Sequence, residues 1–203
     1  MITSGAEFGS DCDAAEYRSV DPIQLLRRWL PPPGSLPALM ALATQGCDEY
    51  PRVRHVLLSE VEDRAVYFHT DSRSAKVQEL SRSSRAAIAL AWPAVGRQVV
   101  GHGDVHRASA REERQVFGRR GRYLQLLAWL NDDETAALAV DERRRRWAQF
   151  DGAHPQLTMP ATWTGFAVEL EELTFWRGDP EGPSHRTRFR RAHDAWVCEE
   201  LAG

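Results

Sequence analysis

Short apolar runs dominate the chain between residues 38 and 105 and return after residue 160. The first set predicts strands at 38–44, 53–58, 65–70, 86–92 and 98–105, with a short helix over 74–80. The second set predicts strands at 163–170, 173–177, 185–191 and 195–200. Many short strands with few intervening helices are typical of a barrel. We therefore predict a mainly β fold with peripheral helices, in the α+β class.

Two helical regions flank these strands. Asp21 and Pro22 form a helix start, because aspartate is a good N-cap and proline suits the first helical position. Apolar positions follow at helical spacing, and the run Pro31–Gly34 predicts the end of that helix. Residues 109–150 also read as helical, with apolar faces at Leu124, Leu127, Leu130, Ala137 and Leu138. The run Arg143–Arg146 is a solvated helix face or, alternatively, an anion-binding patch.

The chain divides into an N-terminal arm and one domain. Residues 1–20 are polar and without periodicity, so we expect a disordered arm, of which residues 7–10 resemble a cloning remnant. Residues 21–203 suit a single domain, with 163–203 completing its cleft. Neither an apolar run long enough to cross a bilayer nor a signal-peptide pattern is present, so we expect a cytoplasmic protein.

Composition narrows the range of partners. A net charge of −3 is too small to predict a nucleic acid or an anionic membrane as partner. Cys12, Cys47 and Cys198 are too few and too far apart for a metal site, and we interpret them as free thiols. The histidines form no pair at ligand spacing, so no metal is predicted. Lys76 is the single lysine among 26 basic residues.

Hydroxyls and cations gather at one predicted strand-to-helix turn. Thr70, Ser74 and Lys76 follow a strand into a short helix, whose N-terminus offers free N–H groups and a partial positive charge. Arg54, from a neighbouring strand, could complete a phosphate clamp. Serine and threonine at such a turn also act simply as helix caps, and the residues alone leave both interpretations open.

A second cluster lies on the C-terminal strands. Aromatic residues at 163, 166, 175 and 176 precede Arg188. At alternating strand positions such residues form a core more often than a cofactor site. The sequence contains neither a glycine-rich dinucleotide motif nor a nucleophile elbow.

Taken in order, these segments resemble the pyridoxamine 5'-phosphate oxidase family from about residue 21 to the C-terminus. The resemblance rests on an ordered set of motifs: Arg54–Leu58, Val66–Thr70, Ser74–Lys76, Ala91–Pro93, Arg97–Val99, Ala128–Trp129, Trp163–Phe166, Phe175–Trp176 and Arg188. It implies a homodimer of split β-barrels with FMN bound at the subunit interface. The residues that it assigns to the cofactor are Arg54, His55, Val56, Leu57, His69, Thr70, Ser74, Lys76, Gln98, Trp176 and Arg188.

The resemblance also implies roles within that cleft. Gln98, Trp176 and Arg188 would lie against the flavin ring, partly from the second subunit, and Arg188 would stabilise negative charge on the reduced ring. His69 and Arg120 are further candidates for catalysis. The substrate positions would be Ser59, Val116, Arg120, Leu124 and Arg186.

Several of these positions depart from the family pattern. Ala75 replaces a basic residue, and Asp133 and Glu134 replace a polar pair. In the substrate shell a lysine becomes Ser59, a tyrosine becomes Val116 and a serine becomes Leu124, while one arginine is kept as Arg120. A phosphate loses about 1.5–3 kcal/mol for each missing charge-assisted bond. An apolar or aromatic substrate is therefore favoured over a vitamin phosphate.

The sequence thus predicts a flavin-type oxidoreductase that transfers a hydride to or from an apolar, aromatic or polycyclic metabolite. A tailoring step in antibiotic biosynthesis, as in phenazine or tetracycline pathways, would suit such a substrate. FMN is the expected cofactor, and an 8-hydroxy-5-deazaflavin coenzyme is the alternative, since Ala75 leaves one cation fewer for a phosphate. Two alternative functions remain open: that of a genuine pyridoxamine 5'-phosphate oxidase, and that of a non-catalytic flavin- or haem-binding split barrel.

Overall fold

The computed structural model describes residues 17, 20–32 and 37–203. Most of the predicted N-terminal arm and the predicted helix end at residues 33–34 lie outside the described residues. Helix α1 spans Pro22–Trp29, and the Asp21 carboxylate accepts from the amides of Ile23 and Gln24 at 2.9 Å each. Tyr17, within the range predicted as an arm, is 5% exposed and lies edge-on to Trp29.

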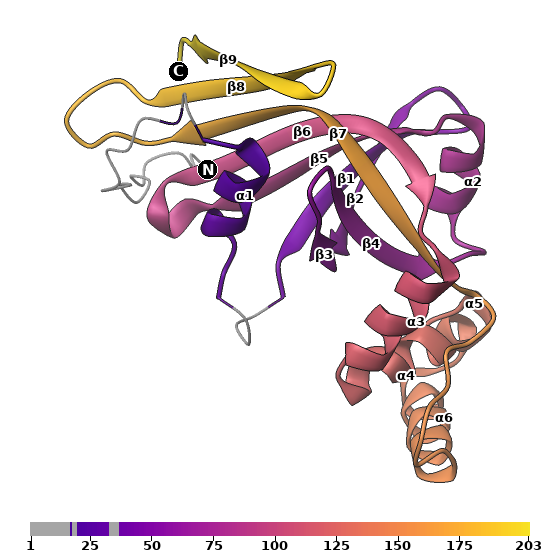
Figure 1. The fold of residues 1–203 in the computed structure, drawn as a ribbon. Coiled ribbons are helices and arrows are strands. Elements are labelled where there is room, and N and C mark those ends of the chain that lie inside the picture. Colours follow the sequence, from indigo (N-terminus) through magenta and orange to yellow (C-terminus); the bar gives the residue numbers. More distant parts are fainter. Residues whose placement is uncertain (1–16, 18–19, 33–36) are drawn as a thin grey trace.

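The described strands form one nine-stranded antiparallel sheet (Figure 1). Their bounds are β1 Leu39–Gln45, β2 Pro51–Leu57, β3 Glu60–Val61, β4 Ala65–Asp71, β5 Arg85–Trp92, β6 Arg97–Arg107, β7 Trp163–Arg177, β8 His185–Ala192 and β9 Ala195–Leu201. The order across the sheet is β2-β1-β5-β6-β7-β4-β3, and β8 pairs with β7 and β9. Strand β3 was not predicted, because two residues are too short to give a periodic signal.

Residues 163–177 form one long strand, so the prediction of two strands here was wrong. The polar pair Glu171 and Glu172 interrupts the apolar alternation, yet the backbone continues through a β-bulge. On β6, His102 faces Glu172 while the next residue, Gly103, faces Leu170. A Cβ on Gly103 would lie 1.8 Å from the Glu169 carbonyl oxygen, so only glycine permits this close approach.

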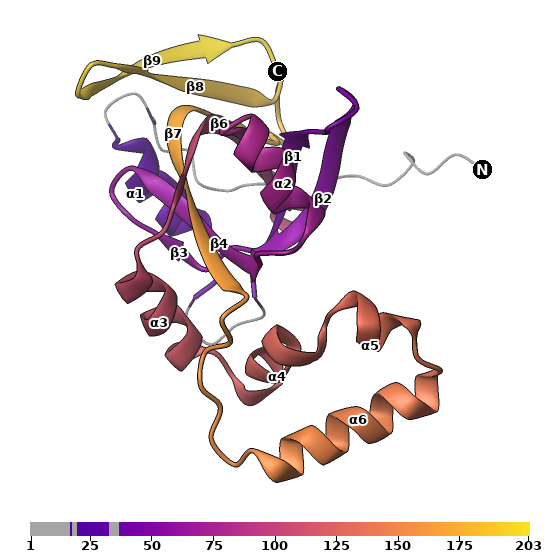
Figure 2. The ribbon, with the colours of Figure 1, turned by 90° about the vertical axis from the view of Figure 1, so that its right-hand side faces the viewer.

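The predicted helical regions are confirmed, although the helices begin and end at slightly different residues than predicted. Helix α2 spans Ala75–Arg82, and a 3-10 turn, η1, spans Pro93–Val95. Residues 109–150 fold as four helices: α3 Ala110–Arg119, α4 Arg122–Leu130, α5 Asp133–Ala137 and α6 Val140–Ala153. Figure 2 shows these four together at one end of the molecule, opposite β8 and β9. Among the described residues, no helix is long and apolar enough to cross a membrane.

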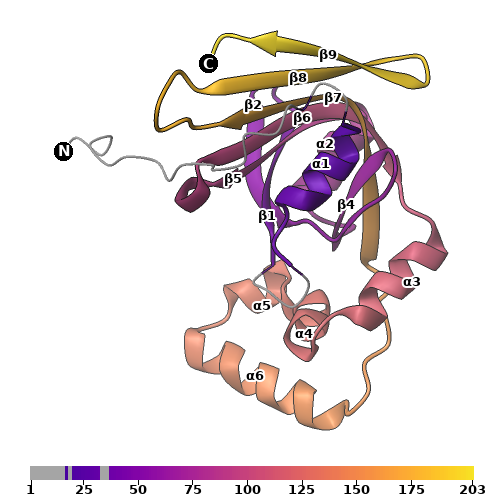
Figure 3. The ribbon, with the colours of Figure 1, turned by 60° about the vertical axis from the view of Figure 1, so that its left-hand side comes forward.

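The core lies inside the curve of the sheet and is closed by α1. Ile23, Leu25, Leu26 and Trp29 are almost fully buried against the inner faces of the strands. Figure 3 shows α1 within the opening of the curved sheet. The expected split-barrel architecture, mainly β with peripheral helices, is thereby confirmed.

The outer face of the sheet is open. One row of paired residues crosses it from β2 to β8: His55, Ala41, Ala89, Val100, Thr174 and Arg188. Neighbouring rows add exposed apolar side chains, with Leu39 at 61% and Val53 at 68% exposure. Helix α6 likewise has no buried residue, and three of the four arginines in its run, Arg143–Arg145, are exposed. The interpretation of that run as a solvated helix face agrees with this exposure.

Candidate functional site

A cavity of about 250 Å³ lies where β4 ends, between α2 and α4. Its lining combines hydroxyls, two cations and apolar side chains: Leu57, His69, Thr70, Asp71, Ser74, Lys76, Arg120, Leu124, Leu127, Ala128, Asn131 and Trp163. A second cavity of about 230 Å³ shares Leu57, Arg120 and Leu124 with it and adds Ser59 and Val116. We call these the phosphate-side cavity and the substrate-side cavity. Seven of the residues predicted from the sequence line the first, and five line the second.

The predicted hydroxyl and lysine cluster is assembled in the phosphate-side cavity. Lys76 Nζ donates to Thr70 Oγ1 at 2.9 Å, and Thr70 Oγ1 lies 3.4 Å from Ser74 Oγ. Ser74 precedes α2 without bonding its amides, so the first N–H groups of that helix have no side-chain cap. Burial, followed by the nearby charge of Arg54, lowers the pKa of Lys76. An anion would offset both effects, so the cluster suits a phosphate.

Arg54 does not line this cavity in the single chain. Its Nη2 donates to Glu79 Oε2 at 2.5 Å, and its Nη1 bonds the Thr44 hydroxyl. Glu79 is 6% exposed, so the pair is a largely buried ion pair at the base of α2. The sequence alone did not reveal Glu79 as a partner. Arg54 can therefore reach a phosphate only if this ion pair loosens or if the ligand approaches from outside it.

The remaining β2 positions alternate across the sheet. His55 is exposed on the outer face, Val56 is buried in the core, and Leu57 lines both cavities. Of these three predicted cofactor contacts, the single chain brings only Leu57 to the phosphate-side cavity. Val56 can contribute through its backbone, since its side chain belongs to the core.

Arg120 lies between the two cavities with an aromatic neighbour and no acidic partner. Its Cζ lies 4.5 Å from the centre of the Trp163 ring, and its Nη2 donates to Ser59 Oγ at 3.4 Å. Among the described residues, no carboxylate forms an ion pair with it. Burial lowers the pKa of Arg120 to about 10. A buried guanidinium without a counter-charge is a ready binding site for an anion.

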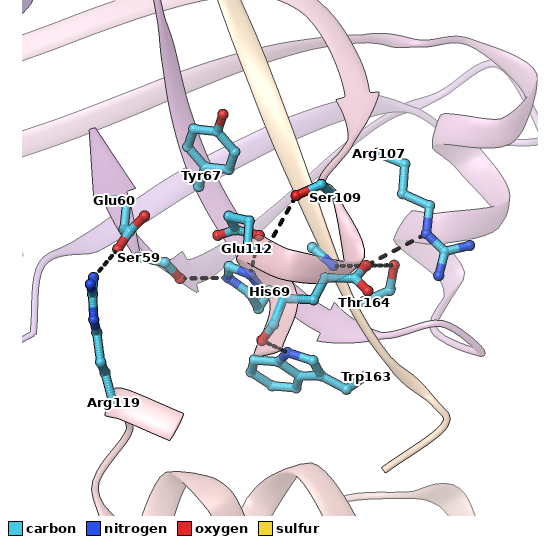
Figure 4. A network of polar contacts seen from close by, with 12 residues as sticks. Ser59, Glu60, Tyr67, His69, Arg107, Ser109, Glu112, Arg119, Trp163 and Thr164 are labelled. Atoms are coloured by element: carbon cyan, nitrogen blue, oxygen red, sulfur yellow. Dashed lines mark hydrogen bonds and ion pairs between the residues drawn. The ribbon is translucent and has the colours of Figure 1, made fainter. Parts of the chain in front are cut away.

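His69 is held by three contacts and its side chain is fully buried. Its Nδ1 lies 2.9 Å from Ser59 Oγ, and its Nε2 lies 3.1 Å from Glu112 Oε2. The ring stacks on Trp163 with the centroids 5.1 Å apart (Figure 4). Gly165 leaves room for it, because a Cβ there would lie 2.7 Å from His69 Nε2. The ring is thus fixed in position and orientation.

Two glutamates of α3 were missed at the sequence level. Glu112 bonds His69, and Glu113 anchors the start of β7. The Glu113 Oε1 accepts from the Gly165 amide at 3.0 Å, and its carbonyl accepts from Trp163 Nε1 at 3.2 Å. Both sit in a run of four charged residues that looks like a solvated helix face. Their inward direction depends on how α3 packs against β7.

The predicted substrate shell has an apolar character. Val116 is 6% exposed and packs with Phe117 and Trp163, while Leu124 faces both cavities. Asp133 and Glu134 line a separate, smaller cavity with Asp71 and Asp132. Among the described residues, no group of three or more histidines, cysteines or acids could hold a metal ion.

The other predicted site residues form a second cluster on the outer sheet face. Gln98 pairs with Trp176, and Trp176 pairs with Arg186 across three neighbouring strands. Arg188 lies two residues along β8, where its Nη2 donates to Glu199 at 2.6 Å. Its Nε is buried and has no hydrogen-bond partner among the described residues.

One chain does not bring the two clusters together. Thr70 pairs with Thr164 on β7, and Trp176 lies twelve residues further along that strand. At about 3.3 Å per residue this is roughly 40 Å of strand, far longer than a flavin ring. A single chain therefore leaves the two clusters of predicted site residues far apart.

The chain is similar in sequence to proteins of one known family. Residues 35–177 match the family described as pyridoxamine 5'-phosphate oxidase. A pyridoxine/pyridoxamine 5'-phosphate oxidase of Acidothermus cellulolyticus is 34% identical, over 99% of this chain and 92% of its own length. One from Salinibacter ruber is also 34% identical, over 90% of this chain and 89% of its own length.

Two solved structures share the fold. PhzG from Burkholderia lata, in complex with tetrahydrophenazine-1-carboxylic acid, superposes with a TM-score of 0.83. It is 24% identical and covers 96% of this chain and all of its own. A pyridoxamine 5'-phosphate oxidase-related, FMN-binding protein of Nostoc punctiforme has a TM-score of 0.68 at 17% identity, covering 94% and 99% of the two chains.

Proposed function

We propose that this chain, which belongs to the pyridoxamine 5'-phosphate oxidase family, is a homodimeric, FMN-dependent oxidoreductase that acts on an aromatic carboxylate. Membership of the family supports flavin binding and oxidoreductase chemistry. The observation that carries the substrate class is Arg120, a largely buried guanidinium between two cavities that has no acidic partner among the described residues. In the substrate-side cavity Arg119 is paired with Glu60 at 2.8 Å, so Arg120 supplies the uncompensated positive charge beside Val116 and Leu124.

The charge count favours a carboxylate over a phosphate ester. A phosphate dianion needs several charge-assisted bonds, each worth about 1.5–3 kcal/mol. Here Val116 and Leu124 supply none in the substrate-side cavity, and the Ser59 hydroxyl supplies at most one. A carboxylate carries one charge, which Arg120 alone can match in a bidentate pair. The similar fold of PhzG, whose structure contains tetrahydrophenazine-1-carboxylic acid, is consistent with a ligand of this type.

The residues present fit a flavin phosphate. Lys76, Thr70, Ser74 and the uncapped N-terminus of α2 would hold the phosphate, and Leu57 would contact the chain beyond it. When bound, the cofactor accepts or donates the hydride. Arg188, whose Nε lacks a partner, would stabilise negative charge at the ring. Ala75 leaves the phosphate one cation short, the feature that keeps a deazaflavin coenzyme as the alternative cofactor.

Dimer formation would join the two clusters. A second copy of the chain on the outer sheet face would cover Leu39, Val53 and Val100 and bring its Trp176 and Arg188 to the phosphate-side cavity of the first. The exposed apolar side chains support this placement, because a soluble monomer rarely leaves a contiguous apolar face open.

A mixed-dimer experiment tests the proposal. Lys76→Ala and Arg188→Ala each damage every site of a homodimer, so each variant alone should leave its sites mostly empty at an FMN concentration that just saturates the wild type. After the two variants are mixed and re-associated, random pairing should restore about one quarter of the sites, because each mixed dimer has one intact site. FMN fluorescence quenching counts those sites, and mass spectrometry of the co-purified molecule identifies the cofactor. No recovery, or a monomer that binds FMN normally, would overturn the two-chain site.

Vitamin B6 oxidation is the second candidate, and the 34% identity to pyridoxine/pyridoxamine 5'-phosphate oxidases favours it. Turnover of pyridoxine 5'-phosphate and of tetrahydrophenazine-1-carboxylic acid by the FMN-loaded protein decides between the two. We expect the vitamin phosphate to bind about a thousandfold more weakly than it would with two or three further charge-assisted bonds. Efficient turnover of the vitamin, with micromolar KM, would make it the substrate. A non-catalytic carrier would bind cofactor and oxidise neither.

A further inference from the structure

A line of hydrogen bonds passes through buried protein between two cavities. It begins at Arg120 and Ser59 in the substrate-side cavity, continues through His69 and ends at Glu112. Glu112 lines an open cavity of about 770 Å³ beside Tyr67, which lies two residues before His69 on the same face of β4. His69 joins the two ends of this line, and its side chain is fully buried while that of Glu112 is 12% exposed. Figure 4 shows Ser59, His69 and Glu112 in one continuous line.

The two ends of this line fix its direction. Arg120 can only donate, so Ser59 Oγ accepts from it and turns its own hydrogen toward His69 Nδ1. The Glu112 carboxylate can only accept, so His69 Nε2 carries the hydrogen and donates to it. The neutral tautomer with hydrogen on Nε2 satisfies both contacts. The same polarity leaves Nδ1 ready to receive a proton.

We propose that Ser59, His69 and Glu112 form a proton relay between the substrate-side cavity and solvent. A proton released in that cavity goes to Ser59 Oγ, the Ser59 hydrogen moves to His69 Nδ1, and the Nε2 hydrogen moves to Glu112. One proton crosses and no electron is transferred. The relay rests on the proposed function for its use, because loss of a hydride from an N–H or O–H substrate leaves a proton to remove.

The surroundings suit an exit at Glu112. Its Oε1 is buried and has no hydrogen-bond partner among the described residues, so it can take a proton. Ser59 Oγ, Glu112 and the Trp163 ring contact His69, and Arg120 packs on Trp163 and donates to Ser59. At the Glu112 end, the Tyr67 hydroxyl donates to Glu62 at 2.7 Å, and burial with that bond raises the pKa of Tyr67. Tyr67 therefore stays protonated and leaves Glu112 as the acceptor.

The test needs neither cofactor nor substrate. In the full chain with 15N-labelled histidine, NMR reports the tautomer of His69 and the rate at which its Nε2 hydrogen exchanges with water; His69→Gln assigns the signal. We expect the Nε2–H tautomer, and exchange about tenfold slower or more in Glu112→Gln, because the outward step is blocked. Glu60→Gln is the matched control, because it removes a nearby carboxylate that forms an ion pair with Arg119, whereas His69 bonds Glu112.

Two results would overturn the relay: the Nδ1–H tautomer in the wild type, or unchanged exchange in Glu112→Gln with the Trp163 indole signal still native. If Glu112→Gln does not fold, Ser59→Ala carries the test through the tautomer and through turnover. With FMN bound normally and tetrahydrophenazine-1-carboxylic acid as the probe, kcat should fall about a hundredfold while KM changes little. An unchanged kcat would also refute the relay. If the wild type does not oxidise the probe, the proposed function fails, and the exchange experiment still judges the relay.

Discussion

Trp163 begins β7 and Trp176 lies near its end, and the two tryptophans stand in opposite surroundings. Trp163 is 5% exposed, its indole nitrogen donates to the Glu113 carbonyl, and His69 and Arg120 pack on it. Trp176 lies half-buried on the outer sheet face, beside Gln98 and Arg186. At the Trp163 end of β7 the side chains are therefore packed by other parts of the same chain, while at the Trp176 end the outer face is partly exposed to solvent.

This difference matches the two tasks that the proposed two-chain site requires. The helical end holds its polar groups in fixed positions before any ligand arrives, which suits anion binding and proton transfer. At the other end, Arg188 donates to Glu199, and its buried Nε has no hydrogen-bond partner among the described residues. Such a group gains its full set of bonds only when a ligand or a second chain covers it. Comparing the two ends experimentally therefore tests the two-chain site.

The largest effect should come from the tryptophans. Trp163→Ala should lower the free energy of unfolding by about 3–5 kcal/mol, because it removes a buried ring and the contacts of that ring with His69 and Arg120. Trp176→Ala should cost less than half as much, since Trp176 is only partly buried. Urea unfolding of both variants at one protein concentration measures the difference. Equal losses would mean that the outer face is as well packed as the helical end.

A smaller effect is expected at the cofactor phosphate. Lys76→Ala should weaken FMN binding by about 10–150-fold, the loss of roughly 1.5–3 kcal/mol of charge-assisted bonding. Arg73→Ala is the matched control, because Arg73 lies in the same turn but pairs with Asp71 in solvent. Fluorescence titration of both apoproteins with FMN, and in parallel with the deazaflavin, gives the comparison. A Lys76→Ala variant with unchanged affinity for both cofactors would show that the phosphate lies elsewhere.

Local signals predicted most of the fold. Asp21 and Pro22 start α1 by short-range hydrogen bonding, and the apolar runs found the strands because each buries one face. The single strand β7 was missed because its bulge at Glu171 is set by pairing with β6, a contact far away in the sequence. The strand propensity of the residues in β7 does not indicate how this strand pairs with β6.

The site was predicted in part. Thr70, Ser74 and Lys76 lie together as the turn suggested. Glu112 and Glu79 escaped notice because each belongs to a charged helix segment whose inward face appears only after packing. Arg54 was assigned to a phosphate but lies in an ion pair, since a sequence motif does not show which carboxylate folding will bring near it.

The smallest effect, and the most local one, concerns two acids at the two ends. Arg73 holds the pKa of Asp71 below its ordinary value at the helical end, and Arg188 does the same for Glu199 on β9. If FMN draws Arg188 to the flavin ring, Glu199 loses its main partner and keeps Arg190 at 3.5 Å, so its pKa rises toward its ordinary value. Asp71 keeps its partner and should not change.

The sign of this shift fixes a pH dependence. A bound state with the higher Glu199 pKa takes up protons, so this group favours FMN binding as pH falls through the interval below 4.5. Carboxyl 13C NMR with and without FMN follows both acids directly, and Arg188→Ala supplies the reference for a Glu199 without its main partner. We expect the Glu199 midpoint of the loaded wild type to move toward that reference while the Asp71 midpoint stays in place. A Glu199 midpoint that FMN leaves unchanged would show that Arg188 stays on the surface, and that the open end of β7 takes no part in holding the ring.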